Sequence, residues 1–433
     1  MIEDLTKTVG KTVTLHGWVE TIRDQGSIIF LVFRDSTAKV QLVVPESSKA
    51  FETVRSLNIE SVIEVTGSVK KEEQAPFGGV EVEVSELKIL SLSDPELPIQ
   101  VVEKNAEKPA LPIRSDYRWI EMRKEKTALI YKVWTQLELA YVQACIEEGF
   151  IQIHSPKLMS TPSEGGSEFF EVKYFEKKAY LVQSPQFYKQ MAQAAGFGGV
   201  FEIGPVFRAE PSFTSRHATE FTGYDFEFSY IESHFDVMEA EERIFVKMLT
   251  SVNDKFGKEI KELYGRELLI PKTPFPKLRM VELKEILKSL GTPSKSEHDI
   301  SPDEEKTISL YVKKELGHEF VFITDYSIEV RPFYHMRYDE KPDVTKSFDL
   351  IWGGLEVTTG AQREHRVDIL KKQATEKGVT HESISKYLEF FTYGCPPHGG
   401  AGLGADRIIM QIFGIKNIRE ASFLPRDPKR LEP

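Results

Sequence analysis

Apolar and polar residues alternate in short runs over the first part of the chain. Glycine, proline and aspartate separate these runs, and β-branched residues are frequent in them. We predict strands at Thr12–Val19, Ile28–Arg34, Lys39–Val44, Val62–Val69 and Val80–Val84. A short helix fits near Ser47–Leu57. Five short strands with a helix after the third predict a small Greek-key barrel of the OB type.

A proline-rich stretch follows the predicted barrel. Its prolines recur without a period between Ser93 and Arg114, which is typical of an extended hinge. Apolar residues then repeat at helical spacing over Lys124–Glu148, and Gly149 would end that helix. We therefore expect three parts: an N-terminal domain over residues 1–92, a hinge over 93–115 and a second domain over 116–433.

The second domain lacks the regular βαβ alternation of a doubly wound sheet. Helical periodicity predicts helices at Asp236–Phe256, Met280–Leu290, Asp303–Leu316, Val367–Lys377 and His381–Phe391. Strands are predicted at Ala179–Val182, Val200–Ile203, Gly223–Tyr230, Phe320–Thr324, Ser347–Trp352 and Gly354–Thr358. This mixture favours an α+β fold, with helices that flank a largely antiparallel sheet.

Composition narrows the class of protein. The 433 residues are 40% hydrophobic and carry a net charge of −11 at pH 7, so contact with nucleic acid would need local basic patches. No apolar run approaches the roughly 20 residues of a membrane span, and the N-terminus has no signal-peptide pattern. Cys145 and Cys395 lack the spacing of a zinc site, and the cytoplasm is the expected compartment.

Two segments that contain an arginine lie far apart in the chain. Arg208 stands in the sequence Phe-Arg-Ala-Glu, and Arg407 ends a glycine-rich run. Guanidinium groups pair bidentately with phosphate, so two of them in one site would suit a ligand with several phosphates. Asp349 and Glu356 lie between these segments and suit Mg²⁺, which prefers hard oxygen ligands. The chain has no Walker lysine loop, so these residues indicate a nucleotide site outside the P-loop class.

These segments resemble the signature motifs of the class II aminoacyl-tRNA synthetases. Residues 149–157 resemble motif 1, which forms the dimer interface in that class, residues 207–217 resemble motif 2, and residues 402–407 resemble motif 3. Residues 183–190 and 360–365 resemble the aspartyl-tRNA synthetases of the archaeal and eukaryotic cytosolic type. The resemblance implies a homodimer that uses ATP and Mg²⁺ to form aspartyl-adenylate and then transfers aspartate to tRNA(Asp).

The resemblance also implies roles for single residues, with Arg208 and Arg407 as the catalytic arginines. ATP would be bound by Arg208, Glu210, Arg216, His217, Ala218, Glu356, Gly404, Ala405, Asp406 and Arg407. Aspartate would be bound by Glu164, Gln186, Lys189, Arg208, Asp225, Thr359 and Arg363. The metal would be held by Asp349, Glu356 and Thr359, a position where the family has serine. Anticodon bases would be read by Phe30, Gln41 and Glu81.

Substrate choice would rest on Arg363 and Lys189. The resemblance gives Arg363 a bidentate contact with the side chain of the substrate aspartate, and it places Lys189 beside that contact. The amide of asparagine would leave these donors unpaired. Asparaginyl enzymes of the same subclass generally lack a lysine here, so Lys189 favours aspartate.

Two local interpretations accompany these assignments. Phe30 would stack on a base, and Arg34 on the same alternating face of the strand favours exposure of that face. Gly399, Gly400, Gly402 and Gly404 would thin the backbone so that a base or ribose can lie against it. The alternative for these glycines is a turn that leads into a helix over Ile408–Phe413.

Several functions stay open from the sequence. The alternatives are an asparaginyl-tRNA synthetase, an asparagine-forming relative and a non-catalytic RNA-binding paralogue. The last is disfavoured because both motif arginines and both metal acids are present. Whether tRNA(Asn) is also charged depends on barrel positions near Glu20 and Pro76. Glu20 matches neither type of relative, whereas Pro76 leans towards the relaxed type.

Overall fold

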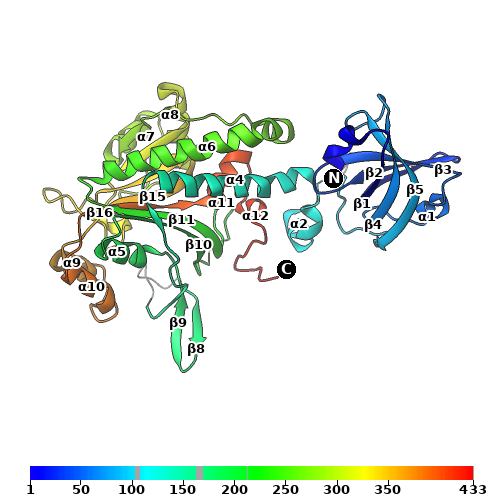
Figure 1. The fold of residues 1–433 in the computed structure, drawn as a ribbon. Helices are drawn as coiled ribbons and strands as arrows, with labels where there is room; N and C mark the ends of the chain where they lie inside the picture. The colour runs from blue at the N-terminus through cyan, green and yellow to red at the C-terminus, as the bar shows by residue number, and fades with distance from the viewer. Residues whose placement is uncertain (103–107, 162–168, 212, 433) are drawn as a thin grey trace. The chain divides into compact units, whose positions relative to one another are not determined.

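The computed structural model describes residues 1–102, 108–161, 169–211 and 213–432 (Figure 1). They form two compact units, Met1–Lys124 and Glu125–Pro433, each with its own core. The division follows Lys124, within the range that the sequence analysis gives to the second domain. Glu164 and part of the predicted hinge lie outside the described residues.

The first unit contains a closed five-stranded barrel in the order β1-β2-β3-β5-β4, which confirms the predicted OB fold. The strands are β1 (Thr12–Asp24), β2 (Ile28–Arg34), β3 (Lys39–Pro45), β4 (Val62–Lys71) and β5 (Val80–Ser91). Alternate residues of each strand fill the interior, as Ile29, Leu31 and Phe33 do on β2. A 3-10 helix, η1 (Ile2–Thr8), precedes the barrel, and helix α1 (Phe51–Arg55) is shorter than predicted.

Two short helices follow the barrel within the same unit, α2 (Leu111–Asp116) and α3 (Arg118–Glu121). Part of this stretch was predicted to be an extended hinge. Pro112 is compatible with a helix because it stands in the first turn of α2, where a missing N–H costs nothing.

The second unit is built on an eight-stranded sheet in the order β12-β13-β14-β15-β16-β11-β10-β6. These strands are β12 (Lys277–Arg279), β13 (Phe320–Thr324), β14 (Ser347–Trp352), β15 (Leu355–Arg363), β16 (His398–Gly404), β11 (Glu220–Ser229), β10 (Gly199–Phe207) and β6 (Ile151–Gln152). The sheet is antiparallel except at its two outermost pairs, which are parallel. The predicted α+β class and antiparallel sheet are confirmed.

Helices pack over one face of the sheet and near its β13 strand. The long helices α4 (Glu125–Glu147) and α6 (His234–Tyr264) lie side by side over one face and share the largest core of the unit (Figure 1). Helices α7 (Met280–Ser289) and α8 (Pro302–Leu316) pack near β13 in a separate apolar cluster. The remaining helices are α5 (Gln186–Ala194), α9 (Val367–Glu376), α10 (Ser385–Thr392), α11 (Ala405–Phe413) and α12 (Ile418–Ala421).

Smaller elements complete the second unit. A three-stranded sheet contains β7 (Leu158–Met159), β9 (Lys177–Leu181) and β8 (Glu171–Tyr174), and a 3-10 helix, η2, spans Ile328–Val330. Among the described residues, no helix combines the length and the apolar character needed to cross a bilayer.

The glycine-rich run before Arg407 is a strand, which was not predicted, and the alternative of a turn is therefore wrong. This strand, β16, lies inside the sheet between β15 and β11. A Cβ atom on Gly400 would lie 2.1 Å from the carbonyl oxygen of Phe226, and one on Gly399 would lie 2.7 Å from that of Ala361. Glycine is therefore required for these strands to approach each other. Ala401 and Leu403 are the apolar side chains of this run, and so short an alternation hid the strand.

A buried acid on α6 gives a testable prediction about stability. Glu241 is fully buried, and neither carboxyl oxygen makes a hydrogen bond of ordinary geometry with a described residue. Burial raises the pKa of its carboxyl from 4.5 to about 8. The folded protein therefore keeps a proton that the unfolded chain loses, and stability falls as pH rises from 4.5 to 8.

Glu241→Gln is expected to remove this part of the pH dependence. Each pKa unit corresponds to about 1.4 kcal/mol, so between pH 5 and 8 the wild type should lose up to about 4 kcal/mol relative to the variant. Urea unfolding of both proteins at the two pH values measures the difference. Parallel stability profiles for the two proteins would contradict the prediction.

Candidate active site

A cavity of about 290 Å³ lies in the second unit and is bordered by residues of β11, β15 and β16. It brings together segments that are far apart in the chain, as predicted. The predicted site residues that line it are Gln186, Arg208, Glu210, Arg216, His217, Ala218, Asp225, Glu356, Thr359, Arg363, Gly404, Asp406 and Arg407. Lys189 and Asp349 are buried outside its lining. Ala405, the first residue of α11, is also buried outside it.

The two predicted catalytic arginines are held differently. Arg407 donates from Nη1 to the backbone oxygen of Glu356 at 2.9 Å and to its Oε1 at 3.2 Å. Arg208 follows the end of β10, where its guanidinium lies 5.4 Å from the centre of the Phe221 ring. Among the described residues Arg208 forms no ion pair, and its Nε lies 3.5 Å from the backbone oxygen of Gln183. Its charge is therefore available to a ligand in the cavity.

Two more residues of the cavity, near Arg407, have shifted pKa values. His217 forms a hydrogen bond with Thr214 at 2.6 Å, and burial together with nearby Arg407 lowers its pKa. A neutral His217 is therefore favoured, and it can contact a phosphate only through a hydrogen bond. Burial raises the pKa of Asp406 to about 6, although its Oδ1 accepts a hydrogen bond from the Ser422 hydroxyl at 2.7 Å.

The predicted metal ligands form a connected group. Asp349 on β14 and Thr359 on β15 are cross-strand partners, and the Thr359 hydroxyl lies 3.4 Å from Glu356 Oε1. Burial and the negative charge of Glu356 raise the pKa of Asp349. Burial alone would raise the pKa of Glu356, but Arg407 and Arg331 lower it below its ordinary value.

One oxygen of this group lacks a partner. Asp349 Oδ2 forms an ion pair with Arg331 at 2.7 Å, whereas its buried Oδ1 has no hydrogen-bond partner among the described residues. Two carboxylates, one of which has an unsatisfied oxygen, and a hydroxyl fit Mg²⁺. In the described part of the chain, no group of three or more His, Cys, Asp or Glu could hold a metal. A bound Mg²⁺ would therefore take its other ligands from water or substrate phosphates.

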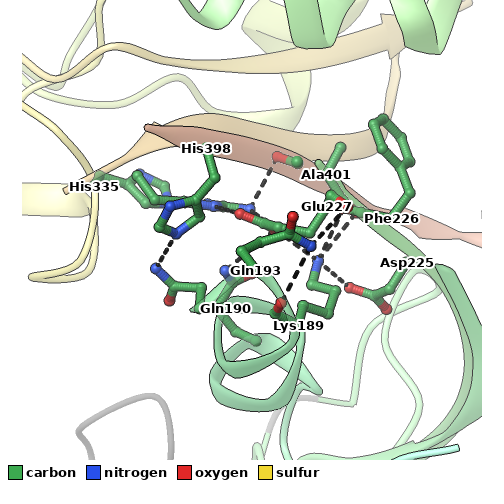
Figure 2. A network of polar contacts seen from close by, with 12 residues as sticks. Lys189, Gln190, Gln193, Asp225, Phe226, Glu227, His335, His398 and Ala401 are labelled. Atoms are coloured by element: carbon green, nitrogen blue, oxygen red, sulfur yellow. Dashed lines mark hydrogen bonds and ion pairs between the residues drawn. The ribbon is translucent and has the colours of Figure 1, made fainter. Parts of the chain in front are cut away.

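The other end of the cavity adjoins a buried cluster of charges (Figure 2). Lys189 on α5 pairs with Asp225 on β11 at 2.8 Å and lies 3.4 Å from Glu227 Oε2. Arg363 at the end of β15 donates to Glu227 from Nε at 2.9 Å and from Nη2 at 3.4 Å. Gln186 Nε2 lies 3.3 Å from Glu227 Oε2. Glu227 is thus the shared partner of three predicted aspartate-binding residues.

Glu227 is ionised although it is completely buried. Burial acts to raise the pKa of its carboxyl, but Arg363 and Lys189 lower it below the ordinary value. This residue was not among those predicted from the sequence. Glu227 lies two positions after Asp225 on the same strand, so its side chain is on the same face. That alternation was the signal that could have identified it.

Arg363 has partners at all three of its guanidinium nitrogens. Besides Glu227, Nη2 donates to the backbone oxygen of Gly400 at 2.9 Å, and Nη1 donates to His335 Nε2 at 2.8 Å. One hydrogen of Nη1 remains for a ligand, because each η nitrogen carries two. His335 accepts this bond as a neutral ring, since burial and then Arg363 lower its pKa. His335 and Arg331 were not identified from sequence, and we find no local pattern that would have revealed them.

The predicted anticodon residues share the outer surface of the barrel. Phe30 is half-buried, with the Arg23 guanidinium 4.9 Å from its ring centre, and Gln41 Nε2 donates to Glu81 Oε2 at 3.1 Å. The expectation that Arg34 is exposed was wrong. Arg34 is buried and forms an ion pair with Glu60 at 2.5 Å. It therefore lends no support to base stacking on Phe30.

The positions linked to tRNA choice differ in their surroundings. Glu20 is buried on β1, where it pairs with Lys39 at 2.9 Å. Pro76 is exposed in the loop between β4 and β5. Pro76 is thus accessible to a macromolecule on the barrel surface.

Family models match both units. Residues 110–428 match the model described as "tRNA synthetases class II (D, K and N)", and residues 13–90 match "OB-fold nucleic acid binding domain". The aspartate–tRNA(Asp/Asn) ligase of Archaeoglobus fulgidus is 42% identical, over 98% of this chain and 97% of that protein. The aspartate–tRNA(Asp) ligase of Pyrococcus abyssi has the same identity and coverage.

Solved structures of aspartyl- and asparaginyl-tRNA synthetases both resemble the structure of this chain. Aspartyl-tRNA synthetase from Entamoeba histolytica superposes with a TM-score of 0.89 at 30% identity, over 100% of this chain and 92% of that one. Asparaginyl-tRNA synthetase from Pyrococcus horikoshii, complexed with asparaginyl-adenylate, gives 0.90 at 32% identity, over 99% and 97%. From its family match and these relatives, the chain belongs to the class II tRNA synthetases of the D, K and N group.

Proposed function

We propose that this chain is an aspartate–tRNA ligase that works in two steps. The aspartate α-carboxylate attacks the α-phosphorus of ATP and displaces pyrophosphate. A hydroxyl of the terminal adenosine of tRNA(Asp) then attacks the aspartyl carbonyl and releases AMP. The observation that carries the proposal is the cluster of Lys189, Arg363 and Glu227 at one end of a cavity whose other end holds Arg208 and Arg407.

The arginines would supply most of the catalysis. In the first step, negative charge grows on the oxygens around the α-phosphorus, and a guanidinium already in place stabilises it without reorganisation. Arg208 is suited to this role because no carboxylate of the described residues pairs with it. Mg²⁺ held by Asp349, Glu356 and Thr359 would neutralise charge on the phosphates. None of the assigned residues is needed as a general base, so positioning supplies the rest.

The charged cluster favours aspartate over asparagine. Lys189 is fully buried, with Nζ also 3.3 Å from the backbone oxygen of Ala401. A substrate carboxylate could accept from the remaining Nη1 hydrogen of Arg363 and lie near Lys189. Each charge-assisted bond contributes about 1.5–3 kcal/mol. An amide in the same place would bring a second donor against these cations.

A second candidate function is the charging of tRNA(Asn) with aspartate. It is favoured by Pro76 and by relatives whose names include both tRNAs, such as the Archaeoglobus fulgidus enzyme. The test is charging of purified tRNA(Asp) and tRNA(Asn) with labelled aspartate. We expect both to be charged. No charging of tRNA(Asp) would refute the first function, and charging of tRNA(Asp) alone would refute the second.

We also propose a homodimer. The motif 1 segment includes β6, the outermost strand at one end of the sheet, and Ile151 on it is 50% exposed. Leu139 and Ile146 on the preceding helix α4 are exposed as well. Burial of these side chains by a second copy would be favourable. Analytical ultracentrifugation should give twice the 49.5 kDa mass of the chain, and a monomer at micromolar concentration would refute the proposal.

The assignment of Phe30 to anticodon binding predicts that its loss affects tRNA charging but not adenylate formation. Stacking of a base on an aromatic ring contributes about 1–3 kcal/mol. Phe30→Ala should therefore raise the KM for tRNA(Asp) roughly tenfold and leave aspartate-dependent pyrophosphate exchange unchanged. His16→Ala, at another exposed site on the barrel, is the control. Equal losses in both reactions would show that Phe30 supports the fold instead.

A further inference from the structure

Helix α8 carries one buried acid, Glu305, which lies next to the ATP-assigned residues Arg216 and Glu356. Glu305 is 5% exposed, and its Oε2 accepts two hydrogen bonds. One comes from Arg216 Nη2 at 2.6 Å, and the other comes from the backbone N–H of Glu356 at 3.2 Å. None of the assignments above uses α8.

These contacts tie three parts of the second unit together. Arg216 lies in the connection between β10 and β11, Glu356 lies on β15, and Glu305 comes from outside the sheet. Glu356 also accepts from Arg407 on α11. Arg216, Glu305, Glu356 and Arg407 thus form a continuous chain of contacts, with two acids between two arginines, along the end of the cavity that is assigned to ATP.

Glu305 can act on a ligand only through its partners. Arg216, Glu356 and Arg407 line the cavity, whereas Glu305 does not. Among the described residues, Nη2 is the one guanidinium nitrogen of Arg216 with a hydrogen-bond partner, so Nε and Nη1 remain for phosphate oxygens. The bond from the Glu356 N–H holds the carboxylate of Glu305 whether or not Arg216 is present.

We propose that Glu305 is a positioning residue for ATP, which orients Arg216 before the nucleotide binds. The inference rests on the proposed function, because the resemblance to class II synthetases that supports that function assigns Arg216 to ATP. A long arginine side chain loses much conformational freedom when it binds a phosphate. An ion pair that has already restricted it lowers this cost. The opposite possibility, that Glu305 competes with phosphate for Arg216, predicts tighter ATP binding when Glu305 is lost.

Glu305→Gln isolates the contact with Arg216. Glutamine still accepts the Glu356 N–H but loses the charge that holds the guanidinium. In aspartate-dependent pyrophosphate exchange, we expect the KM for ATP to rise roughly tenfold, while kcat and the KM for aspartate change less than about twofold. Asp303→Asn on the same helix, where the side chain is 93% exposed, should leave all three unchanged.

A double-mutant cycle tests whether Glu305 acts through Arg216. In an Arg216→Ala background, Glu305→Gln should add no further rise in the KM for ATP. If Glu305→Gln does not fold, Glu305→Asp should show the same pattern with a smaller rise. A fall in the KM for ATP would overturn the inference in favour of competition. Equal rises in both KM values would reduce Glu305 to general support of the fold.

Measurement of exchange by the wild type distinguishes a failure of this inference from a failure of the proposed function. If the wild type catalyses no aspartate-dependent exchange, the proposed function fails. If the wild type is active and Glu305→Gln matches it in the KM for ATP, only the positioning role fails.

Discussion

Arg363→Leu is expected to lower kcat/KM for aspartate in pyrophosphate exchange by roughly 10–10²-fold, while ATP still binds. The range corresponds to the loss of the one charge-assisted bond, of about 1.5–3 kcal/mol, that the remaining Nη1 hydrogen can donate. Because Arg363 also neutralises the fully buried Glu227, the variant should be less stable by about 3–5 kcal/mol. Exchange kinetics, ATP titration and urea unfolding measure the three effects.

The double variant Arg363→Leu/Glu227→Leu separates recognition from stability. It removes both members of the buried pair, so much of the stability should return while aspartate activation stays lost. Recovery of activity in the double variant would contradict a direct role for Arg363. Normal aspartate turnover in Arg363→Leu itself would refute the account of the amino-acid end of the cavity.

Arg208→Ala should show a different balance, with a large catalytic loss and little change in stability. Removal of a single donor to a developing oxyanion typically lowers kcat by about 10²–10³-fold, and a charged donor belongs at the upper end. Arg208 has no ion-pair partner among the described residues, so its loss leaves no described carboxylate unpaired. Single-turnover adenylate formation and thermal unfolding together test this balance.

A control arginine is available for this variant. Arg279 pairs with Glu282 on the surface, where such pairs contribute about 0–1 kcal/mol, so Arg279→Ala should preserve both activity and stability. If Arg208→Ala unfolds at a much lower temperature than Arg279→Ala, Arg208 has a structural role. Undiminished adenylate formation in Arg208→Ala would remove it from the mechanism.

Elements with strong periodicity were predicted well. Ile28–Arg34, Phe320–Thr324 and Ser347–Trp352 match strands in the structure, and the helix predicted over Lys124–Glu148 is α4. In these segments, local pattern and tertiary burial agree. Strand β16 was missed because its glycines carry no pattern, and its position depends on two neighbouring strands that no local signal specifies.

The site could be predicted only in part, because some of its contacts join elements that are distant in the sequence. The motifs identified residues that face the cavity, such as Arg208, Glu356 and Arg407. They did not identify Glu227 and Glu305, the buried acids that hold the cationic residues in place. Each of these acids lies on a different element from the cation it pairs with, so sequence spacing carries no information about the contact. Arg34 was misplaced likewise, because its partner Glu60 lies beyond the next strand.

The central claim is that cations at one end of a nucleotide cavity select the aspartate side chain. Amino-acid-dependent exchange of labelled pyrophosphate into ATP tests it most directly, because the assay needs neither tRNA nor the barrel. The wild-type protein should exchange with L-aspartate and show no exchange with L-asparagine above the rate without amino acid. Exchange that depends on asparagine and not on aspartate would contradict the claim.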